Sequence, residues 1–94
     1  MAELADIRLE LDKLDDELIN LFIKRMSLTD EVAKIKIRDG LPLFHKGRED
    51  EILDRLSEGL DSEMAEYVKA LYQKIFEISR TRQQSIMNEN DYKG

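Results

Sequence analysis

The chain has 94 residues, of which 38% are charged and 41% are apolar, with a net charge of −6 and no cysteine. This length suits one domain with a modest core. The acidic balance argues against general binding to nucleic acids or anionic membranes, and the lack of cysteine excludes disulfides and thiolate catalysis. The start of the chain lacks the features of a signal peptide and no segment reaches transmembrane length, so we expect a cytoplasmic protein.

A long amphipathic helix is predicted from about residue 4 to residue 38. Neither Gly nor Pro interrupts it, and apolar residues recur at alternating spacings of three and four: Leu4, Ile7, Leu11, Leu14, Leu18, Leu21, Leu28, Val32 and Ile35. At about 1.5 Å per residue, the stretch from Leu4 to Ile37 is a rod of roughly 51 Å. A compact chain of this length has a radius of gyration of only about 12 Å. Its own chain cannot cover such a rod, so we expect a partner chain to do so.

Arg25 interrupts this apolar series, and a guanidinium placed among Leu, Ile and Val needs an anion. The anion is either an acidic side chain, as is usual for a buried arginine, or a ligand. Lys36 lies on nearly the same face, about 16 Å further along the axis, so it either holds the other end of a small dianion or is an ordinary solvated lysine. Arg8 lies about 25 Å before Arg25, so it is either a surface charge or part of a site in a second chain.

Two more helices are predicted after a turn. Gly40 can cap the first helix in a left-handed conformation, and Pro42 prevents its continuation. A short second helix is expected at about 47–57. A third is expected at about 62–87, because Gly59 ends the second helix and Asp61 and Ser62 offer N-cap oxygens. The polar residues 88–94 are expected to be a frayed tail. The predicted fold class is therefore all-α.

Four polar residues on the second and third helices adjoin their apolar faces. Arg48 and Glu49 lie one turn before Ile52 and its neighbour, so both should face inward. Ser79 and Gln83 continue an apolar stripe, and the alternative for these two is a solvated helix end. The only histidine lies near no nucleophile and no metal-ligand spacing, so triad chemistry and a zinc site are poorly supported.

Taken in order, these residues resemble the all-helical chorismate mutases along nearly the full length of the chain. The matching segments are Ile7 to Asp15, Arg25, Val32 to Lys36, Pro42, Arg48-Glu49, Ser79 and Gln83. The resemblance implies a monofunctional single domain over residues 1–94, with three helices per chain in an intertwined homodimer. It implies conversion of chorismate to prephenate, a Claisen rearrangement in phenylalanine and tyrosine biosynthesis, without a cofactor or metal.

The resemblance also implies how the dicarboxylate substrate is bound. Arg25 binds one carboxylate, and Arg8 arrives from the other subunit for the second. Ser79 contacts a carboxylate, and Arg48 helps to hold the loop and the substrate.

The remaining implied roles concern the reacting bond and the ring. Lys36 and Gln83 donate to the ether oxygen from opposite sides, and Lys36 also contacts a carboxylate. Glu49 accepts a hydrogen bond from the ring hydroxyl. Lys36, Gln83, Arg25 and Glu49 are thus the expected catalytic residues. His45 stands where many relatives carry Asp, so it is left outside the expected site.

Two alternatives stay open at this point. One is an isochorismate-pyruvate lyase, which has a similar fold and a similar cationic site. The other is a non-catalytic helical dimerisation module, in which Arg25 pairs with an acid and sets the register of the two chains.

Overall fold

The computed structural model describes residues 2–93, and the side chains of residues 3–89. The chain forms three helices, α1 over Ala2–Asp39, α2 over Lys46–Ser57 and α3 over Ser62–Lys93, and no strand occurs within residues 2–93. This confirms the predicted all-α class with a long first helix and a short second one. None of the helices, over the residues described, is long and apolar enough to cross a membrane.

The end of α1 follows from its sequence. Gly40 adopts a left-handed φ of 68°, which a residue with a side chain rarely does. The Gly40 N–H donates to the Ile37 carbonyl at 3.3 Å, and the Leu41 N–H donates to the Lys36 carbonyl at 2.7 Å. These two bonds form a Schellman motif that satisfies the last carbonyls of the helix. The chain then turns back toward α3.

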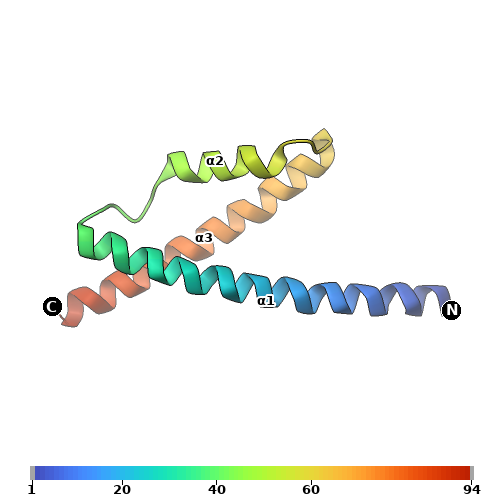
Figure 1. Ribbon diagram of the computed structural model, residues 1–94, viewed down its shortest axis with the longest axis horizontal. Coiled ribbons are helices and arrows are strands. Elements are labelled where there is room, and N and C mark those ends of the chain that lie inside the picture. Colours follow the sequence, from blue (N-terminus) through green and yellow to red (C-terminus); the bar gives the residue numbers. More distant parts are fainter. Residues whose placement is uncertain (1, 94) are drawn as a thin grey trace.

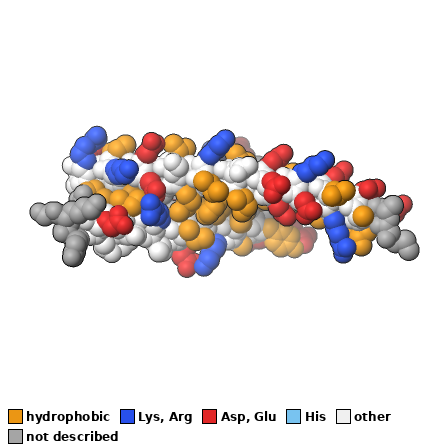
Figure 2. Space-filling view, turned by 90° about the horizontal axis from the view of Figure 1, so that it is seen from below, with side chains coloured by type: hydrophobic (Ala, Val, Ile, Leu, Met, Phe, Trp, Pro, Cys, Tyr) orange, Lys and Arg blue, Asp and Glu red, His pale blue; other side chains and the backbone are white. Residues whose placement is uncertain are grey.

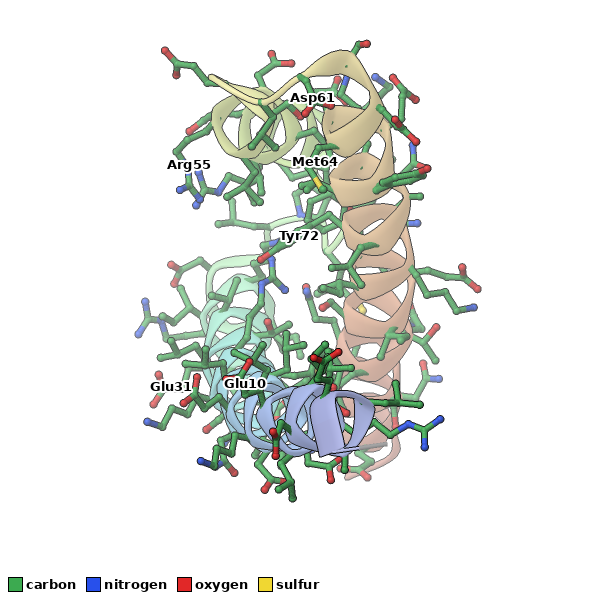
Figure 3. All side chains as sticks on the ribbon, turned by 90° about the vertical axis from the view of Figure 1, so that its right-hand side faces the viewer. Glu10, Glu31, Arg55, Asp61, Met64 and Tyr72 are labelled. Atoms are coloured by element: carbon green, nitrogen blue, oxygen red, sulfur yellow. The ribbon has the colours of Figure 1, made fainter. Side chains whose placement is uncertain are left out.

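Side chains cap the starts of α2 and α3. The imidazole Nδ1 of His45 accepts a hydrogen bond from the Arg48 N–H at 2.9 Å, so His45 is the N-cap of α2. Asp61, at the turn between α2 and α3 (Figure 3), accepts from the Met64 N–H at 2.8 Å. Each cap satisfies one of the free N–H groups of a first turn.

The predicted frayed tail over residues 88–94 was wrong, since α3 continues to Lys93; Gly94 lies outside the described residues. Neither Gly nor Pro occurs within α3, so no residue stops it. Gln84 Nε2 donates to Asn88 Oδ1 at 3.0 Å, one turn further along. The polar residues at the end of the chain are compatible with a solvent-exposed helix as well as with a frayed tail, so composition did not distinguish the two.

α3 is the centre of the chain, because it packs against both α1 and α2, whereas α1 and α2 do not pack against each other over the residues described (Figure 1). Ala33 of α1 is fully buried, and so small a side chain allows two helices to approach closely. A bidentate ion pair joins the two long helices, with Arg82 Nε and Nη2 of α3 at 2.9 and 3.0 Å from the carboxylate oxygens of Asp30 on α1.

The N-terminal half of α1 extends beyond the other helices (Figure 1). The chain measures 59 × 28 × 14 Å and has a radius of gyration of 17.2 Å, against about 12 Å for a compact chain of this length. Apolar side chains therefore stay at the surface, where Figure 2 shows them grouped between charged ones. Between residues 4 and 23, every Leu and Ile is between 48% and 62% exposed: Leu4, Ile7, Leu9, Leu11, Leu14, Leu18, Ile19, Leu21 and Ile23.

Candidate active site

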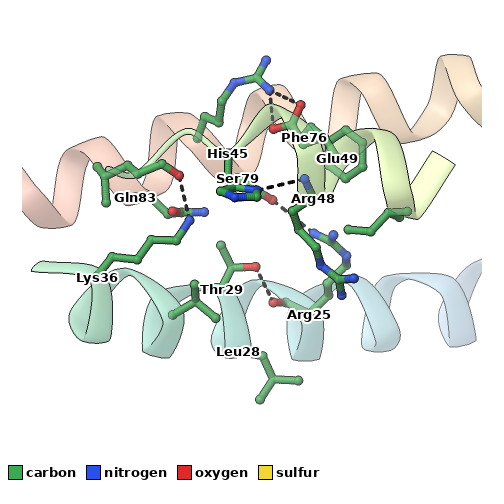
Figure 4. A pocket seen from close by; sticks show the side chains of 14 residues that line it. Arg25, Leu28, Thr29, Lys36, His45, Arg48, Glu49, Phe76, Ser79 and Gln83 are labelled. Carbon is green, nitrogen blue, oxygen red and sulfur yellow. Dashed lines mark hydrogen bonds and ion pairs between the residues drawn. The ribbon is translucent and has the colours of Figure 1, made fainter. Parts of the chain in front are cut away.

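A pocket of about 290 Å³ lies where the three helices meet the connection between α1 and α2. Six of the seven predicted site residues line it (Figure 4): Arg25, Lys36, Arg48, Glu49, Ser79 and Gln83. Arg8, the seventh, is not among the residues that line the pocket. The lining holds four cationic side chains and one carboxylate, so the pocket concentrates positive charge on an otherwise acidic chain.

Arg25 enters the pocket from α1 without an acidic partner. None of the ion pairs found among the described residues includes it, so within this part of one chain the internal ion pair is not formed. Its Nη1 donates to Ser79 Oγ at 3.3 Å. The Tyr72 and Phe76 rings of α3 lie 5.6 and 5.8 Å from its guanidinium carbon. Aromatic faces hold a guanidinium without neutralising it, so Arg25 can still bind an anion.

Lys36 lies on the same face of α1 as Arg25, at the opposite end of the pocket (Figure 4). Its Nζ donates to the Leu43 carbonyl at 2.8 Å, which ties the connection after α1 to the helix. An ammonium has three donors, so two remain for a ligand. In Figure 4 the ends of the Lys36 and Gln83 side chains point toward each other across the pocket.

Ser79 and Gln83 are buried, at 5% and 8% exposed, so the solvated-end interpretation of these two residues was wrong. The Gln83 amide oxygen has no hydrogen-bond partner within the described protein. Most buried polar atoms in proteins have a partner, and leaving one without costs about 1–3 kcal/mol. This oxygen accepts but cannot donate, and Gln83 lines the pocket, so a hydrogen-bond donor on a ligand can pair with it.

The first turn of α2 supplies the acidic member of the pocket. Glu49 accepts hydrogen bonds from Arg80 on α3, with Arg80 Nη1 at 2.6 Å from Oε1 and 2.5 Å from Oε2. Arg48 lines the pocket, but its Nη1 donates a hydrogen bond to Glu51 Oε1 at 2.9 Å, and Glu51 is not among the lining residues. Its guanidinium is exposed and is therefore free to exchange this partner for a ligand.

Two ionisable residues that line the pocket, His45 and Arg80, were not in the predicted site. His45 lines it in addition to capping α2. Arg80 was missed because it lies next to the apolar stripe of α3 instead of in it. Its position three residues before Gln83 was the available signal, since residues three apart are neighbours on the surface of a helix.

Comparisons with known proteins give one consistent answer. A family model described as chorismate mutase type II matches residues 7–84. The T-protein of Haemophilus influenzae is 37% identical over 92 residues, which are 98% of this chain and 23% of that protein. The chorismate mutase of Methanocaldococcus jannaschii is 38% identical over 56 residues, which are 60% of this chain and 57% of that protein. The chain thus spans less than a quarter of the T-protein.

A solved structure matches nearly the whole chain. The chorismate mutase of Helicobacter pylori, crystallised in complex with prephenate, superposes with a TM-score of 0.84 and 34% sequence identity. The match covers 95% of this chain and 98% of that one. Because the family model matches residues 7–84 and this structure matches 95% of the chain, this chain belongs to the chorismate mutase type II family.

Proposed function

We propose that this protein converts chorismate to prephenate. The observation that carries the proposal is the pocket itself, which gathers Arg25, Lys36, Ser79 and Gln83 around a space of about 290 Å³. Its cations suit a dicarboxylate, and the buried Gln83 side chain, whose amide nitrogen is a donor, lines the same space. Membership of the family and the prephenate bound by the Helicobacter pylori relative support the same substrate class.

The reaction is a rearrangement within one molecule and needs no nucleophile, acid or base from the protein. Two effects carry it. Binding both carboxylates fixes the flexible enolpyruvyl arm over the ring before the barrier is reached. Donors aimed at the ether oxygen stabilise the negative charge that grows there as the C–O bond lengthens.

Named side chains fill these roles in the proposal. Arg25 binds one carboxylate, with Ser79 beside it at 3.3 Å from the guanidinium. Lys36 uses the donors that Leu43 leaves free, and Gln83 donates to the ether oxygen from the α3 side. Glu49 accepts from the ring hydroxyl.

Two further arginines complete the substrate site in this proposal. Arg48 closes the site from α2 by turning from Glu51 to the substrate. Arg8 of another copy of the chain binds the second carboxylate. Arg8 is about 25 Å from Arg25 along one helix, so it reaches a site that contains Arg25 only across a dimer interface. The exposed apolar side chains on the N-terminal half of α1 support a homodimer in which this half packs on the partner chain.

The test is to supply the purified protein with chorismate and, separately, with isochorismate, and to identify the products. The proposal expects prephenate from chorismate. Salicylate and pyruvate from isochorismate would indicate the lyase alternative instead. An absence of product from both substrates would favour a non-catalytic dimerisation module. Arg25→Ala is the matched negative control, because it removes a central cation of the pocket without removing a helix.

A further inference from the structure

Arg80 links α3 to the first turn of α2 through a single carboxylate. One of its terminal nitrogens bonds both oxygens of Glu49, at 2.6 and 2.5 Å. The Glu49 side chain is only 21% exposed and that of Arg80 39%, so solvent weakens this pair less than the more exposed ion pairs within α2. The orientation of Glu49 is therefore set from α3.

The same guanidinium contacts the segment before α2. Its central carbon lies 5.1 Å from the centre of the Phe44 ring, within the range of a cation–π contact. Phe44 directly precedes His45, the N-cap of α2, and Glu49 follows four residues after that cap. Arg80 thus holds the chain on both sides of the point where α2 begins.

The start of α2 has few other attachments to the rest of the chain. α2 packs on α3 and not on α1 over the residues described. On the α1 side, the hydrogen bond from Lys36 to the Leu43 carbonyl holds the connection that precedes α2. Without Arg80, Glu49 and Phe44 would lose their shared anchor, and the wall of the pocket that contains Glu49 would be free to shift.

We propose that Arg80 is a positioning residue of this site, which fixes the Glu49 carboxylate so that it can accept a hydrogen bond from the substrate. A carboxylate has about four acceptor positions on its two oxygens. One guanidinium nitrogen leaves positions open toward the pocket, so Glu49 can serve Arg80 and a ligand hydroxyl together. This assignment rests on the proposed function, because it takes the substrate hydroxyl as the partner of Glu49.

A double-mutant cycle tests the assignment. Arg80→Met keeps the unbranched stem and removes the charge, and Glu49→Gln keeps the shape of its partner. Residues that act together show coupled effects on mutation, and independent ones show additive effects. We expect Arg80→Met to lower kcat/KM about tenfold in the parent, and by less than about twofold when Glu49 is already Gln. Arg80→Lys, which retains a single charge, should recover part of the loss.

Arg82→Met is the matched control, since Arg82 lies on the same helix and forms an equally direct ion pair between elements, with Asp30, outside the pocket. It should leave kcat/KM near the parent value. The assignment is overturned if Arg80→Met is as harmful with Gln at position 49 as with Glu, because Arg80 would then act without Glu49. It is also overturned if Arg82→Met lowers activity as much as Arg80→Met does. Parent protein that turns over neither chorismate nor isochorismate would instead overturn the proposed function.

Discussion

At the scale of single residues, the role of Gln83 in the pocket can be tested through the hydrogen-bonding chemistry of its side chain. Gln83 is buried, and its amide oxygen has no partner within the described protein. A neutral amide donates a hydrogen bond at any ordinary pH, whereas a carboxylic acid donates only while protonated. The difference between these two groups can be used to test whether Gln83 donates to the ether oxygen.

Gln83→Glu should therefore retain activity in acid and lose it as the pH rises past the pKa of the new carboxyl group. The measurement is kcat/KM as a function of pH for the parent and the variant. Gln84→Glu is the control, since Gln84 is exposed and pairs with Asn88 outside the pocket. A Gln83→Glu profile with the shape of the parent's would remove Gln83 from the ether-oxygen contact.

At the scale of elements, short side-chain contacts decide where α2 begins and how the long helices meet. His45 caps α2 with a ring nitrogen that accepts from the Arg48 N–H at 2.9 Å. An acceptor on a short side chain is what this position requires.

His45→Ala should therefore lower the free energy of unfolding by about 1 kcal/mol, a usual value for a lost N-cap. His45→Asn, which carries a side-chain oxygen suited to the same position, should restore most of it. Urea unfolding of the three proteins measures the effect independently of catalysis. Equal losses in the two variants would mean that His45 stabilises the chain by packing and not by capping.

The ion pair between α1 and α3 gives a dependence of stability on pH. The hydrogen bond from Arg82 is the main cause that lowers the pKa of Asp30 below its ordinary value of 3.8, and the charge of Arg82 adds to the effect. The folded-state pKa is thus below the unfolded one. The pair contributes its full stabilisation above pH 3.8, and the contribution is lost as the pH falls through the lower, folded-state pKa.

Asp30→Asn should then lower the melting temperature at neutral pH and flatten its decline in acid. Thermal unfolding of parent and variant between about pH 6 and pH 2 measures both effects. Asp54→Asn is the control for loss of one negative charge, because Asp54 is in none of the ion pairs found among the described residues. Parallel curves for parent and Asp30→Asn would show that the pair contributes nothing to the acid response.

At the scale of the whole molecule, a single chain forms a pocket that lacks Arg8 and leaves a long apolar surface of α1 exposed. The chain's radius of gyration of 17.2 Å reflects this open form. The dimer that we propose, in which each pocket receives Arg8 from the other chain, would account for both features.

Subunit complementation tests the shared site. Arg8→Ala and Arg25→Ala should each be nearly inactive as pure homodimers. Unfolding them together and refolding at equal concentration makes about half of the dimers mixed. In a mixed dimer one site carries both lesions and the other carries neither, so activity should recover to about a quarter of the parent value.

Two controls make the complementation result interpretable. Each mutant is refolded alone, and subunit exchange is verified with chains of different mass. If Arg8 served its own chain, every site of a mixed dimer would carry one lesion. No recovery after verified exchange would therefore contradict the shared-site arrangement.

The sequence by itself determined the three helices, because helix formation depends on neighbours a turn away. The spacing of apolar residues in α1, the left-handed turn at Gly40 and the capping oxygen of Asp61 are all local features. Six pocket-lining residues were likewise named from sequence, through their order along the chain and the resemblance this order carries. The length of α3 was misjudged because polar residues suit both an exposed helix and a tail.

Only the tertiary structure decided which side chains meet. Arg80 pairs with Glu49 across 31 positions of sequence, and Arg25 meets Ser79 across 54. Such contacts depend on how α3 packs against the other helices, and no local pattern encodes the result. For the same reason, the structure showed that Arg25 finds aromatic rings and a hydroxyl, not an acid, within the described part of its own chain.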